Sequence, residues 1–253
     1  MKKTNNIENT RLLLTIFTKQ GASHSSMNTL YIVSTPIGNL EDITFRAVRI
    51  LKEASLILAE DTRHSRVLLE HYGISTKMES YHDFNKEQVT PKYVEYLKNT
   101  GDIALVSDAG TPGIADPAFN LVRACKAEHI PVRAVPGANA LLTALVASGF
   151  ATDRFRFENF SPKKSAQREH LLQKLKNDGN STLIFYASPH NLVKFLGEIK
   201  KVYGEVNVAL MRELTKKFEE HLTGTPTELL EHYKNRTPKG EYVLLIDKAE
   251  NEK

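Results

Sequence analysis

One loop of this chain concentrates the residue types that form ligand sites. It runs from Ser107 to Pro117 and holds two glycines, two prolines and two aspartates among eleven residues. Glycine permits close backbone approach, proline stiffens the chain, and aspartate accepts hydrogen bonds from hydroxyl and N–H groups. An apolar run at 103–106 precedes the loop, and open α/β sheets bind ligands where such a strand ends. We therefore interpret the loop as the floor of a ligand site; an elaborate turn is the alternative.

Two further loops of unusual composition follow strand patterns, at residues 34–39 and 60–64. Strand and helix patterns alternate repeatedly between residues 30 and 148, which predicts a mostly parallel sheet with helices on both faces. Right-handed crossovers then place the three loops at one edge of this sheet. The expected strands are 30–33, 56–58, 77–81, 103–106 and 132–135.

The alternation becomes less regular after residues 149–153. Consecutive strand patterns without an intervening helix predict a mixed sheet in this part of the chain. We expect an N-terminal α/β domain at 27–148 and a C-terminal α/β domain at 152–248. Residues 1–26 show no clear periodicity, which predicts a loose N-terminal extension.

Composition limits the classes of function. The chain has 253 residues and a formal net charge of +4, which permits nucleic-acid binding without indicating it. The single cysteine, Cys125, excludes an internal disulfide framework and a cysteine-based zinc cluster; a packed core thiol in a reducing cytoplasm fits. The nine histidines show no metal-binding spacing, and no apolar stretch reaches the ~20 residues of a membrane span. Neither a dinucleotide motif nor a P-loop motif is present, and we expect no metal and no membrane partner.

Four stretches together resemble a known family: 30–40, 60–63, 107–117 and 212–220. Over residues 27–247 the chain is similar to the ribosomal RNA small-subunit (cytidine-2′-O-)methyltransferases of the tetrapyrrole methylase superfamily. The resemblance implies that S-adenosyl-L-methionine binds in a cleft between the two α/β domains, in a cytoplasmic homodimer. The implied substrate is the ribose 2′-hydroxyl of a cytidine in the decoding region of small-subunit ribosomal RNA, within an assembled 30S-type subunit.

The resemblance places residues of both domains around the cofactor. The N-terminal domain would form the substrate cleft and the cofactor loops, and the C-terminal domain would close over the adenine and contact RNA. A methyl donor carries no phosphate, so the groups to be bound are ribose hydroxyls, adenine N–H groups and a carboxylate. The implied cofactor-binding residues are Pro36, Gly38, Asp108, Gly110, Thr111, Gly113, Ile114, Ala115, Gly137, Ala138, Asn139, Tyr186, Met211, Arg212 and Gly240.

Glu60, Asp61 and Arg63 follow the second expected strand and are the catalytic candidates. Methyl transfer to a ribose hydroxyl is an in-line displacement by a weak nucleophile, so both alignment and a base that takes the proton contribute. We expect Asp61 to be that base and Arg63 to bind a phosphate or the ribose. Alternatively, Asp61 and Arg63 pair with each other and only shape the loop.

Basic residues interleaved with phenylalanines at 154–168 are the best local evidence for RNA binding. Their cations, Arg168 included, could meet phosphates, and exposed rings could stack unpaired bases. Alternatively, the alternation of Phe155 and Phe157 reflects a strand with one buried face, and Lys217 belongs to a solvated charged surface. The expected RNA-binding residues are Asn39, His64, Asn85, Arg154, Arg156, Lys163, Lys164 and Lys217.

The chain departs from the family pattern outside the cofactor loops. It has His82-Asp83-Phe84-Asn85 where the family usually has His-Glu-His-Asn, so a hydrogen-bond donor is lost at Phe84. Ser161 replaces the leucine of Phe-Leu-Pro, and Asn191 replaces the arginine of Pro-His-Arg. These departures bear on RNA contacts and leave the expected cofactor site intact.

Two other functions stay open at this stage. A tetrapyrrole (precorrin-type) methyltransferase of the same superfamily would need a wide cleft for an acidic macrocycle, and the segment at 60–63 argues against it. A non-catalytic ribosome- or RNA-binding protein could keep the fold. A decayed cofactor site, however, would not need loops so rich in glycine and proline.

Overall fold

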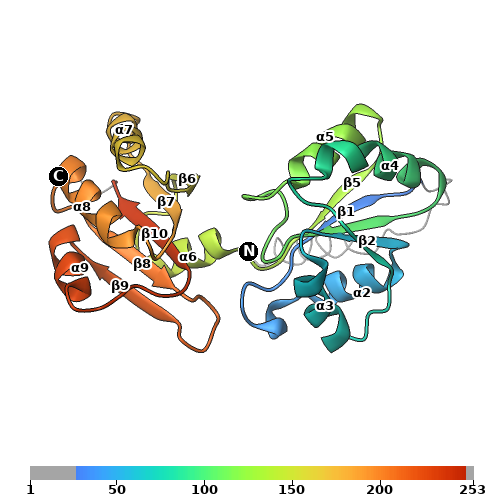
Figure 1. The fold of residues 1–253 in the computed structure, drawn as a ribbon, viewed down its shortest axis with the longest axis horizontal. Helices are drawn as coiled ribbons and strands as arrows, with labels where there is room; N and C mark the ends of the chain where they lie inside the picture. Colours follow the sequence, from blue (N-terminus) through green and yellow to red (C-terminus); the bar gives the residue numbers. More distant parts are fainter. Residues whose placement is uncertain (1–26, 249–253) are drawn as a thin grey trace, which may run out of the picture.

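Two five-stranded sheets, each with its own helices, organise residues 27–248, the part of the chain that this computed structural model describes (Figure 1). The extension expected at residues 1–26 lies outside the described residues. The N-terminal sheet lies on the right of Figure 1 and the C-terminal sheet on the left. The predicted fold class, with one parallel and one mixed sheet, is confirmed.

The N-terminal sheet is parallel throughout and has the strand order β3-β2-β4-β1-β5. Its strands β2 and β4 are four-residue apolar runs that are wholly buried, as a sheet covered on both faces requires. The strands are β1 (Leu30–Val33), β2 (Leu56–Ala59), β3 (Met78–Ser80), β4 (Ile103–Val106) and β5 (Val132–Val135).

Helices cover both faces of this sheet. On one face, α4 and α5 bury Leu97 and Leu121; on the other, α2 and α3 bury Leu51 and Leu69. Burial raises the pKa of the Cys125 thiol of α5 to about 11, as expected for a packed core thiol. The helices are the 3-10 turn η1 (Leu40–Asp42), α2 (Phe45–Glu53), α3 (Thr62–His71), α4 (Lys86–Asn99) and α5 (Ala118–Ala127).

The C-terminal sheet is mixed and has the strand order β6-β7-β10-β8-β9. Strand β6 runs parallel to β7, whereas β10 is antiparallel to both β7 and β8, and β9 is antiparallel to β8. Helices α7, α8 and α9 cover one face around Phe195 and Leu244. The elements are β6 (Phe155–Phe160), α7 (Ser165–Lys176), β7 (Thr182–Ala187), α8 (Leu192–Tyr203), β8 (Val208–Arg212), β9 (Glu220–Gly224), α9 (Pro226–Tyr233) and β10 (Tyr242–Asp247).

Helix α6 (Ala140–Ser148) packs on the C-terminal sheet, although we expected it to be the last element of an N-terminal domain at 27–148. Its buried residues Leu141, Ala144 and Leu145 share a core with Ile184 and Leu245. Both faces of the N-terminal sheet already carry helices, whereas the second face of the C-terminal sheet is left for α6 to cover. The chain therefore changes sheets before α6, at about residues 136–139, rather than after it.

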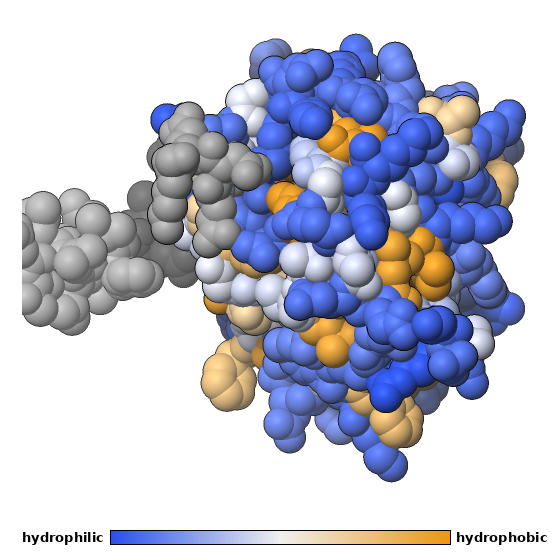
Figure 2. All heavy atoms as spheres, turned by 90° about the vertical axis from the view of Figure 1, so that its left-hand side faces the viewer, coloured by the Kyte–Doolittle hydropathy of each residue, from blue (hydrophilic) through white to orange (hydrophobic). Residues whose placement is uncertain are grey.

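The side of the molecule formed by the C-terminal half is mostly hydrophilic. Figure 2 views that side and shows small, separated hydrophobic spots among polar side chains. Within residues 27–248, no helix is long and apolar enough to cross a membrane.

Arg168 is a buried structural residue, so its expected contact with RNA is wrong. Only 1% of its side chain is exposed, and it forms a two-pronged ion pair with the buried Glu198 of α8, at 2.6 and 2.7 Å. It also donates to the carbonyls of Pro162 and Lys163. Arg168 lies on the face of α7 that packs against α8. A sequence rich in basic residues does not show which of them such packing will bury.

Replacing Arg168 tests this buried pair. We expect Arg168→Met to lower the free energy of unfolding by about 3–5 kcal/mol, because it leaves the Glu198 carboxylate buried without its partner. Lys201→Met is the matched control: it breaks an exposed pair with Glu169 on the same two helices and should cost less than ~1 kcal/mol. Urea unfolding measures both, and equal losses would contradict the structural role.

Candidate active site

Loops from three strands meet at one edge of the N-terminal sheet. Thr35 after β1 and Gly110 after β4 exchange two backbone hydrogen bonds of 2.9 and 3.0 Å. The Ser34 hydroxyl donates to the Thr111 hydroxyl at 3.0 Å, and Thr111 donates to the Ala138 carbonyl at 3.2 Å. The loops after β1, β4 and β5 are therefore joined into one surface.

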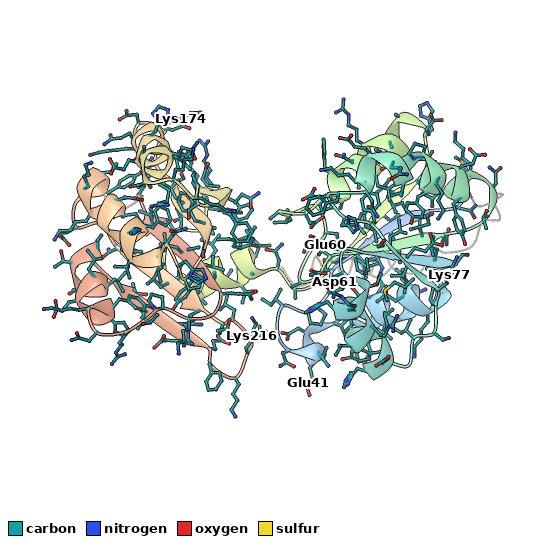
Figure 3. All side chains as sticks on the ribbon, viewed as in Figure 1. Glu41, Glu60, Asp61, Lys77, Lys174 and Lys216 are labelled. Atoms are coloured by element: carbon teal, nitrogen blue, oxygen red, sulfur yellow. The ribbon has the colours of Figure 1, made fainter. Side chains whose placement is uncertain are left out.

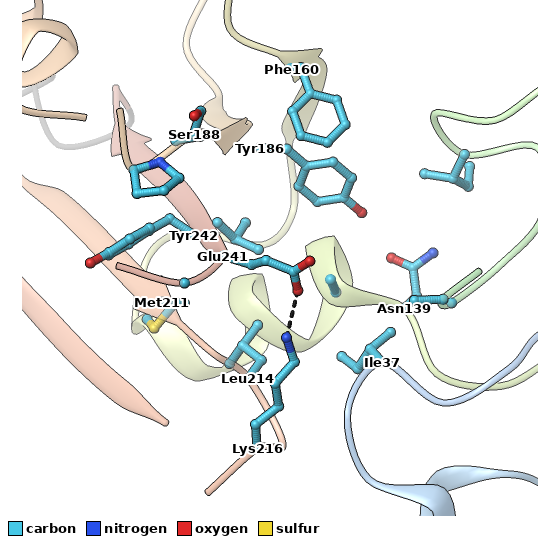
Figure 4. A pocket seen from close by; sticks show the side chains of 18 of the residues that line it. Ile37, Asn139, Phe160, Tyr186, Ser188, Met211, Leu214, Lys216, Glu241 and Tyr242 are labelled. Carbon is cyan, nitrogen blue, oxygen red and sulfur yellow. Dashed lines mark hydrogen bonds and ion pairs between the residues drawn. The ribbon is translucent and has the colours of Figure 1, made fainter. Parts of the chain in front are cut away.

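A cavity of about 380 Å³ lies between this surface and the edge of the C-terminal sheet (Figure 4). Cavities of this size accommodate drug-sized ligands. The walls are mainly apolar, with a few uncharged polar groups and the ion pair of Lys216 with Glu241. Both halves of the chain are thus needed to form the cavity.

Several of the expected cofactor residues line this cavity: Gly110, Thr111, Ile114, Asn139, Tyr186, Met211 and Gly240. The Tyr186 ring contacts those of Phe157 and Phe160, at centroid distances of 4.9 and 5.3 Å, and its hydroxyl points towards Asn139 (Figure 4). Burial raises the pKa of Tyr186, so its hydroxyl stays protonated and can donate a hydrogen bond.

The other expected cofactor residues lie outside the lining, and several support its loops. The Gly113 N–H donates to the Asp116 carboxylate at 2.7 Å, and Arg212 Nε donates to the Lys239 carbonyl at 2.7 Å. A Cβ at position 137 would lie 2.9 Å from the Ser34 Cβ, so glycine permits this approach. This group consists of Pro36, Gly38, Asp108, Gly113, Ala115, Gly137, Ala138 and Arg212.

Sequence reasoning missed the lining residues around the end of β7 and the start of β10. These strands are antiparallel neighbours in which Ala187 pairs with Tyr242, a contact that no local pattern predicts. The sequence pointed only to those lining residues that lie inside the stretches at 30–40, 107–117 and 212–220, such as Ile37, Ala109 and Lys216. The missed residues are Ile37, Ala109, Ala140, Phe160, Ala187, Ser188, Pro189, Leu214, Lys216, Glu241, Tyr242 and Val243.

The two halves touch where Gly38 meets the turn at 214–216. A Cβ at position 38 would lie 2.4 Å from Lys216 Cγ and 3.1 Å from the Leu214 carbonyl oxygen. Lys216 Nζ pairs with Glu241 at 2.6 Å and with Glu213 at 3.2 Å, at the edge of the C-terminal half that faces the N-terminal half (Figure 3). This contact closes one side of the cavity.

Asp61 and Arg63 form the intramolecular pair that the sequence left as the alternative. Asp61 begins α3 and accepts hydrogen bonds from the Arg63 backbone, at 2.8 Å, and from its guanidinium, at 2.7 and 3.1 Å. These bonds hold the pKa of the Asp61 carboxyl well below its usual range. Asp61 therefore caps α3 and orders the loop, as the alternative interpretation has it, and its role as a base stays a prediction.

Glu60 has the opposite environment. Burial raises the pKa of its carboxyl above its ordinary 4.5, and the negative charge of Asp108 raises it further; a backbone hydrogen bond from Asp108 acts the other way. Asp116 and Asp83 add smaller repulsions. Glu60 lies at the edge of the N-terminal half that faces the C-terminal half (Figure 3) and is not among the residues that line the cavity. The backbone of Asp108, to which it is bonded, directly precedes the lining segment at 109–111. In the described part of the chain, no group of three or more His, Cys, Asp or Glu side chains is placed to hold a metal ion.

The expected RNA-binding residues divide by their partners. Arg156 pairs with Glu158 and Asp178, and Lys217 lies 5.7 Å from the centroid of the Phe218 ring. The side chains of Asn39 and Asn85 accept hydrogen bonds within their own turns. Among the expected residues, Arg154, Lys163, Lys164, His64 and Lys217 are exposed and lack an ion pair within residues 27–248.

Comparison with known proteins gives a consistent picture. The Tetrapyrrole (Corrin/Porphyrin) Methylases profile matches residues 29–230. "Ribosomal RNA small subunit methyltransferase I" of Halalkalibacterium halodurans is 48% identical over 219 residues, which cover 87% of this chain and 75% of that protein. The protein of the same name from Pasteurella multocida is 50% identical over 222 residues, covering 86% of this chain and 78% of that protein.

Solved structures share the fold at much lower identity. A diphthine synthase matches with a TM-score of 0.66 at 12% identity, over 87% of this chain and 90% of that one. Uroporphyrin-III C-methyltransferase from Thermus thermophilus, complexed with S-adenyl homocysteine, matches with a TM-score of 0.61 at 18% identity, over 86% of this chain and 97% of that one. These likenesses show the fold alone.

A methyl group at position 38 tests the contact between the halves. We expect Gly38→Ala to weaken binding of S-adenosylhomocysteine about tenfold, because the added Cβ pushes the 214–216 turn away from the cavity at a strain of roughly 1–2 kcal/mol. Gly197→Ala is the control, since a Cβ at this position of α8 meets no atom within 4 Å. Titration calorimetry measures both variants, and equal affinities would show that the contact does not shape the cavity.

Proposed function

Since the chain belongs to the tetrapyrrole methylase family, we propose that it methylates the ribose 2′-hydroxyl of a cytidine in the decoding region of small-subunit ribosomal RNA. It is an S-adenosylmethionine-dependent methyltransferase. The observation that carries the proposal is the cavity between the halves, built from the loops on which the resemblance rests, with the half-buried Glu60 beside it. The relatives named as ribosomal RNA methyltransferases support the class of substrate.

A tetrapyrrole methyltransferase is the weaker candidate. The solved structures with that activity are under 20% identical to this chain, and a shared fold does not define a substrate. A non-catalytic RNA-binding protein is weaker still, because the loops that form the cavity keep their hydrogen bonds and close glycine contacts.

The lining of the cavity fits S-adenosylmethionine. Its apolar walls suit an adenine ring, and the uncharged polar groups of Asn139, Tyr186 and Ser188 suit hydroxyl and N–H groups. The start of α6, at Asn139 and Ala140, opens on the cavity and offers N–H groups to a carboxylate. When bound, the cofactor supplies an electrophilic methyl group. The chain's own residues orient the reactants and exclude water from the cavity.

We assign the role of base to Glu60 rather than to Asp61. A base must be ionised at working pH and must bind a proton strongly enough to take it from a hydroxyl, so a raised pKa favours catalysis. Burial and the Asp108 charge give Glu60 such a pKa, whereas the Arg63 pair lowers that of Asp61. Arg63 then acts by holding Asp61, and its remaining N–H groups face solvent.

Binding of RNA would use exposed cations of the C-terminal half. Lys163 and Lys164 precede α7 in a loop whose carbonyls Arg168 holds, so the lysines project from a fixed support. Cations of this kind bind phosphates and lose affinity as salt rises. We infer that the acceptor is presented by an assembled 30S-type subunit in the cytoplasm.

We also propose a homodimer. Leu142 and Val146 of α6 are 46% and 74% exposed, although the helix is apolar almost throughout. Side chains four residues apart lie on one face of a helix, so the two form a single apolar strip that a second copy could cover.

A labelling experiment tests the proposed reaction. The protein is incubated with radiolabelled S-adenosylmethionine and with small ribosomal subunits from cells that lack it, and the RNA is digested with alkali. We expect label in one alkali-resistant dinucleotide, because a methylated 2′-oxygen blocks cleavage of the adjacent phosphodiester. Absence of label on both subunits and naked RNA, with S-adenosylmethionine binding intact, would overturn the proposal.

Glu60→Gln tests the base. We expect kcat to fall by about 10²–10⁴-fold while affinity for S-adenosylhomocysteine is unchanged. Wild-type kcat should fall as pH drops through the raised pKa of Glu60, since protonation removes the base. The ionised Glu60 opposes folding above that pKa, so the variant should be at least as stable as wild type at neutral pH.

Asp61→Asn is the matched control for this experiment. Asparagine still caps a helix, so the variant loses mainly the charge of the pair and should keep most of kcat. A larger loss of kcat in Asp61→Asn than in Glu60→Gln would return the role of base to Asp61.

A further inference from the structure

Two exposed phenylalanines, Phe84 and Phe119, follow the two strands that flank β2, the strand that directly precedes Glu60. The strand order β3-β2-β4 places the loop after β2, which carries Glu60, between the loops that follow β3 and β4. The Tyr81 N–H after β3 donates to the Ala59 carbonyl at 2.8 Å, and the Asp108 carboxylate after β4 accepts from the Asp61 N–H at 2.9 Å. The residues before and after Glu60 are thus each bonded to one flanking loop.

Phe84 projects from the first of these loops. Its side chain is 99% exposed, although the turn that carries it is closed by hydrogen bonds. His82 N–H donates to Asn85 Oδ1 at 2.9 Å, Asn85 N–H donates to the His82 carbonyl at 3.1 Å, and the Asn85 side chain donates to Ser80. The Phe84 ring lies edge-to-face with the His82 ring, with 6.1 Å between the centroids. An ordered turn therefore presents an apolar ring to solvent.

Phe119 lies in the first turn of α5, directly after the second loop, and is 61% exposed. Asp116 fixes that turn by accepting from the N–H groups of Gly113 and Ala118. The backbones under both rings are thus held in place, and neither ring contributes to the cores of the N-terminal half.

The carboxylates around Glu60 determine which chemical groups can bind beside these rings. Asp83, next to Phe84, and Asp116, three residues before Phe119, are close enough to raise the pKa of Glu60, as Asp108 also does. Two cations lie near these carboxylates, and both are paired: Lys86 with Asp83 at 2.8 Å and Arg63 with Asp61 at 2.7 Å. Such a carboxylate-rich edge repels phosphate groups and accepts neutral planar rings that carry N–H donors.

We propose that Phe84 and Phe119 form a stacking site for unpaired RNA bases on either side of Glu60. This inference rests on the proposed function and names how the acceptor is held. A base stacked on one of these rings places its ribose at the strand edge that carries Glu60. Single-stranded RNA is commonly recognised in this way, by aromatic side chains under splayed bases.

Substitution of each ring by an aliphatic and by an aromatic residue separates stacking from simple apolar contact. We expect Phe84→Leu and Phe119→Leu each to weaken binding to unmethylated small subunits by about 5- to 150-fold, the range that one stacked base contributes. Phe84→Tyr should bind as wild type. Phe45→Leu is the control, because Phe45 is 98% exposed at the start of α2 and follows β1, which is not a neighbour of β2, the strand before Glu60.

Salt dependence supplies a second readout. The logarithm of the affinity is plotted against the logarithm of salt concentration; the slope should be unchanged in the Phe84 and Phe119 variants, since stacking releases no counterions. Lys164→Ala should reduce the slope by about 1 if it contacts a phosphate. Binding of S-adenosylhomocysteine, measured by calorimetry, should be normal in every variant.

The outcomes are distinct. If the leucine variants bind subunits as wild type does while wild type labels the RNA, the stacking site is overturned and the proposed function stands. A reduced salt slope in Phe84→Leu would likewise overturn stacking in favour of a phosphate contact. If wild type itself fails to label subunits, the proposed function fails first, and the stacking site with it.

Discussion

The hydrogen bonds between Thr35 and Gly110, with the hydroxyl chain from Ser34 through Thr111 to Ala138, fix the geometry on which the cavity depends. Three strands end at this edge, and each would otherwise leave a loop free to move. The shared bonds make the loops one surface, so these loops have less freedom to lose when a ligand binds. Preorganisation of this kind reduces the entropy lost on binding.

Two adjacent carboxylates show how such a frame separates chemical roles. Asp61 faces a guanidinium and the first N–H groups of α3, which stabilise its charge and remove its basicity. Glu60 lies close to Asp108, and burial together with the repulsion of that charge raises its pKa. The backbone bonds on either side of Glu60 hold it against that repulsion.

The sequence predicts the fold well because the strands are short apolar runs and the helices have clear periodicity. It also predicts the meeting of the loops, which follows from parallel strands alone. The placement of α6 and the lining around Ala187 and Tyr242 escaped prediction because both depend on pairing between distant segments. The sequence also left open which carboxylate pairs with Arg63, since residues 60–63 offer both Glu60 and Asp61 as partners.

The distribution of charge suggests how the two halves share an RNA substrate. The edge near Glu60 carries carboxylates, exposed rings and the paired cations Arg63 and Lys86. Arg154, Lys163 and Lys164, exposed cations that lack an ion pair within residues 27–248, belong to the C-terminal half. A polyanion laid across Glu60 would raise its pKa further and favour the protonated form, which cannot act as a base. If phosphates are bound by the C-terminal half and only a neutral base and ribose enter beside Glu60, that carboxylate can stay ionised. Separation of phosphate binding from base binding is thus a requirement of the chemistry that we propose.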